Sequence, residues 1–520
     1  MSKFLKGTII LLIAGLVTRV LGFINRIVIA RFIGEEGVGL YMMAFPTLML
    51  VITITQLGLP VAISKSVAEA EAQRDFKKIK KILVVSLATT FTLSLIFTPA
   101  LFFSAPYLSD LLFTDNRTRL PLLAITPIIP IVAISAVLRG YFQGRQNMKP
   151  SAYSQVIEQI VRITLIAVLT KMFLPYGIEF AAAGAMLAAV IGEFISLAYL
   201  FTAFKLKKKF RVRKRFFSQI RDGKETFKEL MGVGIPTLGS RLIGNFSWFL
   251  EPIVVSYSLA LAGVGTVMAT KQYGSLTGFA MPLLFLPSFI TYSLSTSLVP
   301  AISEANSRND KGLIEYRLQQ ALRFVFLTGG LAIVILYVLA DPLMEVMYGS
   351  TSGAIFIKIM APFFLLYYYQ GPLQATLQAL DLARAAMINS VIGAAVKIVV
   401  IFALASQPSF GINGAALGII IGMVLVTFLH FATVLKRISF TFYIRDYVKA
   451  FIVMGVTGWF GYETFAHLSV ETSIVLKLII ATSVITISYI VLLFIFGLIR
   501  KNDVKRVPII GRFLALFAFK

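Results

Sequence analysis

The sequence has no cysteine and only two histidines, His430 and His467, among its 520 residues. The absence of cysteine excludes disulfides, thiolate nucleophiles and the usual zinc sites built from cysteine and histidine. We therefore expect a protein without a metal site or another cofactor.

Charge is also scarce in this chain. Charged residues make up 14% of the sequence, against about 25% in a typical soluble domain, and hydrophobic residues make up 58%. Apolar runs of about 18 residues or more alternate with short charged stretches, which is the pattern of membrane-spanning helices. The glycine-containing segment 232–239 has the wrong spacing for a dinucleotide loop, and there is no Walker motif. These features predict an all-α integral membrane protein that is not an enzyme.

The charges that are present are mostly positive, with 49 Lys and Arg against 24 Asp and Glu. Binding to nucleic acid is not expected, because the basic runs are short and lie between apolar segments. Every second connection is basic, whereas Glu35–Glu36, Ser406–Gly411 and His467–Glu471 contain no Lys or Arg. The positive-inside rule then places both termini in the cytoplasm and makes the number of spans even.

We predict about fourteen transmembrane helices from this alternation. Their ranges are near 7–33, 39–70, 82–113, 120–142, 151–174, 178–204, 229–262, 268–302, 323–347, 353–380, 385–406, 411–435, 447–467 and 473–499. The prolines within or beside these spans predict bends in the helices. The basic, amphipathic segment 500–520 is expected on the inner surface of the membrane.

The sequence also repeats itself. Leu122–Ile163 aligns with Ile357–Ile398 at a shift of about 235 residues, which places Pro127 on Pro362. Apolar helices can resemble one another by chance, but here prolines and polar residues coincide at one shift. Duplicated halves around a central site are typical of alternating-access transporters. The predicted organisation is an N-terminal lobe of six spans (1–204), a basic cytoplasmic linker (205–228), a C-terminal lobe of six spans (229–436), two further spans (437–499) and a cytoplasmic tail (500–520).

The first span carries three arginines, Arg19, Arg26 and Arg31. Arginine near the middle of a bilayer costs at least about 2.5–3.5 kcal/mol, so such a residue should face a hydrated cavity or an anionic partner. The alternative is that the side chain extends to the membrane surface. That alternative suits Arg31, which lies near the outer end beside Glu35, and we assign Arg31 a structural or gating role. Arg19 and Arg26 lie about two helical turns apart on one face, and we expect both in a cavity.

The seventh span carries Arg241, Asn245 and Glu251, and the eighth begins near Lys271. By the duplication, the seventh span corresponds to the first, so cationic helices from two halves would line one cavity. The alternative is an ion pair between Arg241 and Glu251 within one helix. Their separation of ten residues disfavours that contact, and we expect all four residues in the cavity.

Other polar residues receive structural or gating roles. Glu158 and Arg162 are four residues apart in the favourable order for an ion pair, and Gln155 lies one turn before Glu158. Lys65 lies near the cytoplasmic end of the second span, where its side chain can reach the membrane surface.

Four segments resemble a known family. Thr18–Gly34 is similar to the first helix of the polysaccharide transporters and lipid II flippases of the multidrug/oligosaccharidyl-lipid/polysaccharide (MOP) superfamily, and Leu59–Lys65 fits the same superfamily. Arg139–Pro150 and Ser154–Gln159 resemble more particularly its sporulation members in endospore-forming bacteria. The similarity runs from the N-terminus to about Ile510.

This resemblance implies a two-lobed, fourteen-helix fold in the plasma membrane. It also implies alternating-access transport of lipid II, or a related undecaprenyl-pyrophosphate-linked precursor, for spore cortex peptidoglycan. The implied partners are this lipid-linked oligosaccharide, membrane lipids and cell-wall synthesis proteins.

The resemblance also suggests which residues hold the head group. In lipid II flippases, arginines of the first helix bind the pyrophosphate-sugar head. Arg19 matches the first of these arginines, whereas the second aligns with Asn25 and Arg26 follows one place later. A basic residue of the eighth helix has no match in Met281–Pro287, and Lys271 is the nearest cation.

Two other functions fit a polytopic membrane protein. A cation-coupled drug exporter of the same superfamily needs an acidic residue in its cavity, for which Glu251 is the stronger candidate and Glu193 the weaker. A membrane-embedded glycan polymerase needs a large outer loop with acid/base residues, and the loops here are short.

Overall fold

The computed structural model describes residues 3–207, 222–469 and 471–499, with side chains from Ala14 onward except those of Lys207 and Ser240. Throughout these residues the regular structure is helical, with no strand, which confirms the predicted all-α class. The predicted tail (500–520) and most of the basic linker (208–221) lie outside the described residues.

The chain forms two compact units. Unit 1 comprises Met1–Gly278 together with Ile401–Gly414, and unit 2 comprises Phe279–Val400 together with Ala415–Lys520. These units are defined by spatial contact, whereas the lobes 1–204 and 229–436 were inferred from sequence duplication. The lobes therefore stay a prediction.

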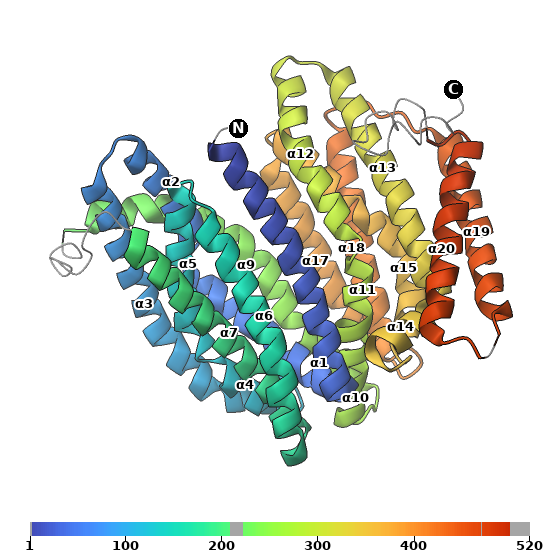
Figure 1. The fold of residues 1–520 in the computed structure, drawn as a ribbon, viewed down its shortest axis with the longest axis horizontal. Coiled ribbons are helices and arrows are strands. Elements are labelled where there is room, and N and C mark those ends of the chain that lie inside the picture. Colours follow the sequence, from blue (N-terminus) through green and yellow to red (C-terminus); the bar gives the residue numbers. More distant parts are fainter. Residues whose placement is uncertain (1–2, 208–221, 470, 500–520) are drawn as a thin grey trace. The chain divides into compact units, whose positions relative to one another are not determined.

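Unit 1 contains the helices that build the candidate site (Figure 1). They are α1 (Lys3–Gln56), α2 (Leu59–Ala72), α3 (Phe76–Tyr107), η1 (Leu108–Leu112), η2 (Asn116–Thr118), α4 (Arg119–Ile125), α5 (Ile128–Gly144), α6 (Lys149–Phe173), η3 (Leu174–Tyr176), α7 (Ile178–Lys207), α9 (Lys224–Leu261) and α10 (Thr266–Tyr273). The π-helical segment η4 (Gly274–Ala280) continues α10 into unit 2.

Unit 2 holds most of the remaining helices. They are α11 (Met281–Phe285), α12 (Ser288–Ser307), α13 (Lys311–Val338), α14 (Ala340–Tyr348), α15 (Ala354–Tyr368), α16 (Gln370–Ala379), α17 (Ala383–Ala405), α18 (Ile412–Leu435), α19 (Ile444–His467) and α20 (Ile474–Ile495). A core that includes Leu298, Leu318 and Leu373 joins α12, α13 and α16.

Helix occupies most of every predicted span. Within the described residues, nine helices are long and apolar enough to cross a membrane, or ten if the bent pair Thr266–Phe285 and Ser288–Ser307 forms one span. The protein is thus a multi-pass membrane protein, and the count of fourteen stays a prediction.

Several predicted spans are broken rather than continuous. The second span is interrupted at Leu57 and Gly58, which have φ angles of 50° and 65°. A Cβ atom on Gly58 would collide with the carbonyl oxygen of Gly234 in α9, so the break needs glycine for both its backbone angle and its close helix contact.

Prolines mark two further breaks. Pro127 separates α4 from α5, and Pro287 precedes α12 at a bend of 50°. Pro362, the predicted counterpart of Pro127, instead lies inside α15, and the chain breaks later at Tyr369.

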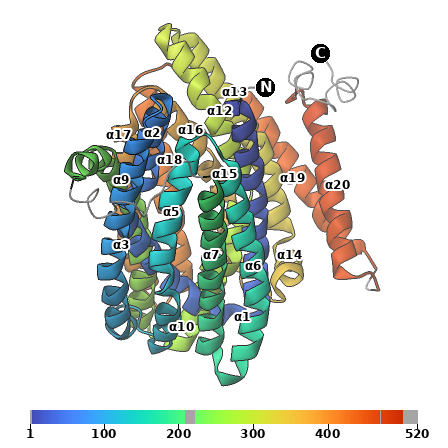
Figure 2. The ribbon, with the colours of Figure 1, turned by 60° about the vertical axis from the view of Figure 1, so that its left-hand side comes forward.

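Three helices of unit 1 set up the site. α6 packs along α7 on one side and along α1 on the other (Figures 1 and 2). α1 is interrupted at Gly34, whose backbone (φ 62°, ψ −170°) is not helical. This break allows both halves of α1 to contribute side chains to one cavity beside α6.

Candidate substrate-binding cavity

A cavity of ≈ 180 Å³ lies inside unit 1. The first half of α1, its second half and α6 supply its walls, and Gly278 of η4 closes one edge. The lining residues are Gly22, Asn25, Arg26, Ile29, Val38, Tyr41, Met42, Phe45, Gln159, Arg162 and Gly278.

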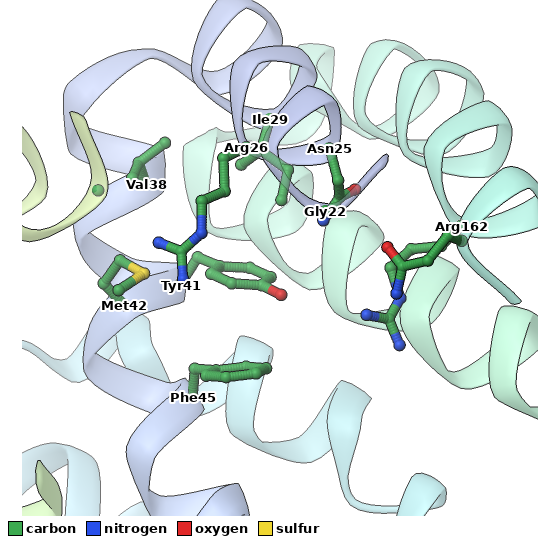
Figure 3. A pocket seen from close by; sticks show the side chains of 11 residues that line it. Gly22, Asn25, Arg26, Ile29, Val38, Tyr41, Met42, Phe45 and Arg162 are labelled. Atoms are coloured by element: carbon green, nitrogen blue, oxygen red, sulfur yellow. The ribbon is translucent and has the colours of Figure 1, made fainter. Parts of the chain in front are cut away.

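Two guanidinium groups enter this cavity from different helices. Figure 3 shows Arg26 of α1 and Arg162 of α6 on opposite sides, with the ring of Tyr41 between them. The rings of Tyr41 and Phe45 stack, with centroids 5.6 Å apart and planes 16° from parallel. The cavity therefore combines two fixed positive charges with an aromatic wall.

The amide side chains of the cavity have unused hydrogen-bonding capacity. Asn25 is only 7% exposed, yet its Oδ1 has no hydrogen-bond partner in the part of the chain that the structure describes. The same holds for Oε1 of Gln159 and Nε of Arg162. Because buried polar atoms are normally hydrogen-bonded, these three atoms favour a polar ligand.

A network of charges lies behind Arg162. The predicted ion pair is confirmed, because Nη2 of Arg162 lies 2.5 Å from Oε1 of Glu158. Arg139 of α5 extends the pair: its Nη2 lies 3.4 Å from Oε2 of Glu158 and 3.1 Å from Oε1 of Glu193 on α7. Nη2 of Arg139 also donates to Oγ of Ser196 at 3.1 Å. Glu193 is thus engaged by a cation inside the helix bundle.

The other residues predicted on the first span lie outside the cavity lining. Arg19 and Arg31 are both exposed on α1. Of the site residues predicted on the first span, Asn25 and Arg26 line the cavity. Arg19 lies seven residues before Arg26, toward the N-terminus.

The predicted residues of the seventh and eighth spans are placed elsewhere in unit 1. Asn245 donates a hydrogen bond to Oγ1 of Thr53 at 2.5 Å, and Lys271 lies 3.7 Å from Oε2 of Glu35. Glu251 is buried, with 6% exposure, and Arg241 is exposed. Their part in substrate binding stays a prediction.

Two residues with proposed structural or gating roles are also away from the cavity. Lys65 forms an exposed contact with Glu69 at 4.0 Å, and Gln155 is half-buried on α6.

Some residues of the site were not predicted. Tyr41 and Phe45 carry no charge, and their only local signal is a spacing of four residues that any apolar helix shares. Arg139 lies in the predicted span near 120–142 and in α5, but no local pattern predicted that its guanidinium group contacts Glu158 of α6 and Glu193 of α7. Gln159 follows Glu158 directly and was recognisable only as part of a polar cluster.

Comparisons with known proteins place the chain in a family. The polysaccharide biosynthesis protein family matches residues 4–306, and the MatE family matches residues 254–403. The chain is 61% identical to stage V sporulation protein B of Bacillus subtilis (strain 168) over 513 residues, which cover 99% of each protein. The chain belongs to the polysaccharide biosynthesis protein family. The resemblance inferred from Thr18–Gly34 and the three other segments is thereby confirmed.

More distant relatives are named as transporters. Lipid II flippase MurJ of Bacillus subtilis (strain 168) is 24% identical over 417 residues, which cover 76% of each protein. Two solved structures have the same fold with a TM-score of 0.69 and 16% identity. One is a multidrug resistance MATE family transporter of the MOP superfamily, and the match covers 81% of this chain and 94% of that transporter. The other is a lipid II flippase MurJ, and the match covers 93% of this chain and 98% of that flippase.

The chain thus shares the fold of solved transporters, and its more distant relatives are named as transporters. None of the relatives described here supports the glycan polymerase alternative. The shared fold does not separate a lipid flippase from a drug exporter, since both have the same TM-score to this chain.

Proposed function

We propose that this protein is an alternating-access flippase for an undecaprenyl-pyrophosphate-linked peptidoglycan precursor, lipid II or a close relative of it. It acts in the plasma membrane, with both termini in the cytoplasm, and supplies spore cortex synthesis. The sequence relationships to a sporulation protein and to a lipid II flippase support this proposal. The single observation that carries it is the pair Arg26 and Arg162, which reach one cavity from two helices.

The chemistry of the cavity suits a pyrophosphate linked to a sugar. Guanidinium groups bind phosphate oxygens in a planar, bidentate geometry and keep their charge in a poorly hydrated site. The amides of Asn25 and Gln159 can hydrogen-bond sugar hydroxyl or acetamido groups. Tyr41 provides an apolar face for a sugar ring.

The size of the cavity restricts which part of the substrate enters it. A cavity of ≈ 180 Å³ is smaller than the about 300–1,000 Å³ of a typical small-molecule site. We therefore assign it to the pyrophosphate and the adjoining part of the first sugar. The rest of the head group would extend beyond it, and the undecaprenyl chain would stay in the bilayer with the membrane lipids. Cell-wall synthesis proteins are the expected recipients of the translocated precursor.

Cation-coupled drug export is the second candidate. The match of residues 254–403 to the MatE family and the burial of Glu251 favour it. An exporter that exchanges a cation at Glu251 stops when this carboxylate is replaced, whereas a flippase that depends on Arg26 and Arg162 continues. Glu251→Gln therefore separates the two functions when lipid flipping and drug efflux are measured side by side.

Reconstitution tests the proposed function. The full chain is placed in vesicles with labelled undecaprenyl-pyrophosphate sugars, and the outward appearance of label is followed while ions and membrane potential are varied. We expect flipping by the wild type and by Lys65→Ala, whose exposed side chain lies outside the cavity. We expect no flipping by Arg26→Ala and a partial rate for Arg26→Lys, which keeps the positive charge but lacks the planar guanidinium group. Equal rates for all four proteins would contradict the proposal.

A further inference from the structure

Two carboxylates, Glu158 and Glu193, lie next to the cavity residue Arg162 and are called here the Glu158–Glu193 pair. Arg139 joins them. Nη2 of Arg139 contacts both carboxylates, at 3.4 Å from Glu158 and at 3.1 Å from Glu193. Glu158 also pairs with Arg162 at 2.5 Å, and Glu193 pairs with Arg139. With both carboxyl groups ionised, the four side chains carry two positive and two negative charges, and the group is then neutral.

Neutrality is important at this place because the group is buried among helices. The side chains of Glu158 and Glu193 are 11% and 4% exposed. A buried charge that loses its partner is strongly unfavourable, and a carboxylate in that situation takes up a proton instead.

Arg162 belongs both to this group and to the cavity. Its Nη2 binds Glu158, while it also lines the cavity and its Nε has no hydrogen-bond partner among the described residues. A phosphate oxygen in the cavity can therefore bind the same guanidinium that holds Glu158. The anion then lies beside Glu158 and shares the positive charge of Arg162 with it.

We propose that binding of the anionic head group is linked to the uptake of one proton by the Glu158–Glu193 pair. This inference rests on the proposed function, because it takes the anion in the cavity as given. The negative charge of the anion beside Arg162 disfavours ionisation of the two carboxyl groups that share one nitrogen of Arg139. A proton from solvent binds one carboxylate oxygen and restores neutrality, and no covalent bond of the substrate changes.

The surrounding charged groups support this assignment. Arg162 lies on the same helix as Glu158, Arg139 faces it from α5 and Glu193 from α7. From α1, the titratable group Tyr41 and the cation Arg26 face the cavity. Figure 3 shows Arg26 across the cavity from Arg162, so Arg26 binds the incoming anion and does not replace Arg162 beside Glu158.

The linkage has a definite sign. Because the bound state holds one more proton, the affinity for the anion rises as pH falls, by up to about tenfold per pH unit for an uptake of one proton. Proton and substrate therefore bind together to the same state of the transporter.

Calorimetric titration of the purified full chain with undecaprenyl pyrophosphate tests the inference. The titration is done at one pH in two buffers that differ in ionisation enthalpy, which gives the number of protons taken up per ligand. We expect about one proton for the wild type. Glu158→Gln and Glu193→Gln should each reduce this number to near zero while binding persists. Glu71→Gln serves as the matched control, because Glu71 pairs with Arg145 away from the cavity and should leave proton uptake unchanged.

The outcomes separate the two proposals. Binding without proton uptake by the wild type contradicts the linkage and leaves the flippase proposal intact. Undiminished proton uptake in both Glu158→Gln and Glu193→Gln also contradicts the linkage, since the proton then binds elsewhere. Absence of wild-type binding contradicts the proposed function and the linkage with it. Two separate variants guard against the failure of one of them to fold.

Discussion

Two charged clusters of unit 1 differ in how completely their charges are satisfied. The first, the Asp115 cluster, consists of Glu36, Asp115, Arg117 and Thr270. Asp115 is 3% exposed and accepts hydrogen bonds from Nη2 of Arg117 at 2.8 Å, from Nε of Arg117 at 3.0 Å and from Oγ1 of Thr270 at 2.6 Å. Arg117 also pairs with Glu36.

The second cluster is the group behind the cavity. There, Nε of Arg139 and Nε of Arg162 have no hydrogen-bond partner within residues 3–207, 222–469 and 471–499, and Arg162 borders an open cavity. The comparison shows that a cluster whose charged groups already have hydrogen-bond partners, such as the saturated Asp115 cluster, holds helices together. An unsaturated cluster beside a cavity has capacity for a ligand, and its charges can be redistributed when the ligand binds.

Removing both cavity arginines should have the largest effect. Each charged hydrogen-bonded contact contributes about 1.5–3 kcal/mol, so each loss should weaken binding of undecaprenyl pyrophosphate about 10- to 150-fold. We expect Arg26→Ala combined with Arg162→Ala to abolish measurable flipping in reconstituted vesicles. The variant should still insert into the membrane, which fractionation checks. Wild-type flipping by the inserted double variant would contradict the role of the cavity.

Breaking the saturated cluster should instead reduce stability and leave binding unchanged. Asp115→Asn removes the charge that Arg117 and Thr270 contact, and we expect a loss of about 2–3 kcal/mol in the free energy of unfolding. Thermal unfolding in detergent measures this loss, and titration with undecaprenyl pyrophosphate measures binding. If Asp115→Asn instead bound undecaprenyl pyrophosphate more weakly and kept its stability, the Asp115 cluster would be a binding site, which would contradict this prediction.

Acid should act on the same cluster. Burial alone would raise the pKa of Asp115, but the hydrogen bonds from Arg117 and Thr270 outweigh burial and hold this pKa below its usual value. A carboxyl group with a lowered folded pKa stabilises the protein above its unfolded pKa of about 3.9. This contribution is lost as pH falls through the lowered folded pKa. We expect the acid-induced decrease in melting temperature to be smaller in Asp115→Asn than in the wild type.

An exposed ion pair should have the smallest effect. Lys65 and Glu69 are separated by 4.0 Å, with side chains 60% and 50% exposed. Exposed pairs of this kind contribute about 0–1 kcal/mol. Lys65→Ala should leave both the melting temperature and flipping near wild-type values. A large loss of flipping would instead place Lys65 among the functional residues.

The sequence carried the signals that act along one helix. Apolar runs separated by charged stretches indicated the spans, and a charge inside the first run indicated Arg26. The spacing of four residues indicated the pair of Glu158 and Arg162. The contacts of Arg139 with Glu193 depend instead on the packing of α5 and α7 against α6, for which the sequence gives no local pattern. Similarly, Lys271 was expected in the cavity but lies beside Glu35, because the position of α10 decides which group it meets.

Site-specific photocross-linking tests the central claim most directly. A photoreactive benzoylphenylalanine replaces Phe45, which lines the cavity, in the full chain in membranes that contain radiolabelled undecaprenyl-pyrophosphate sugar. We predict a labelled adduct that is lost when Arg26 and Arg162 are also replaced by alanine. An adduct that persists without the two arginines, or no adduct in a protein that flips the lipid, would contradict the account.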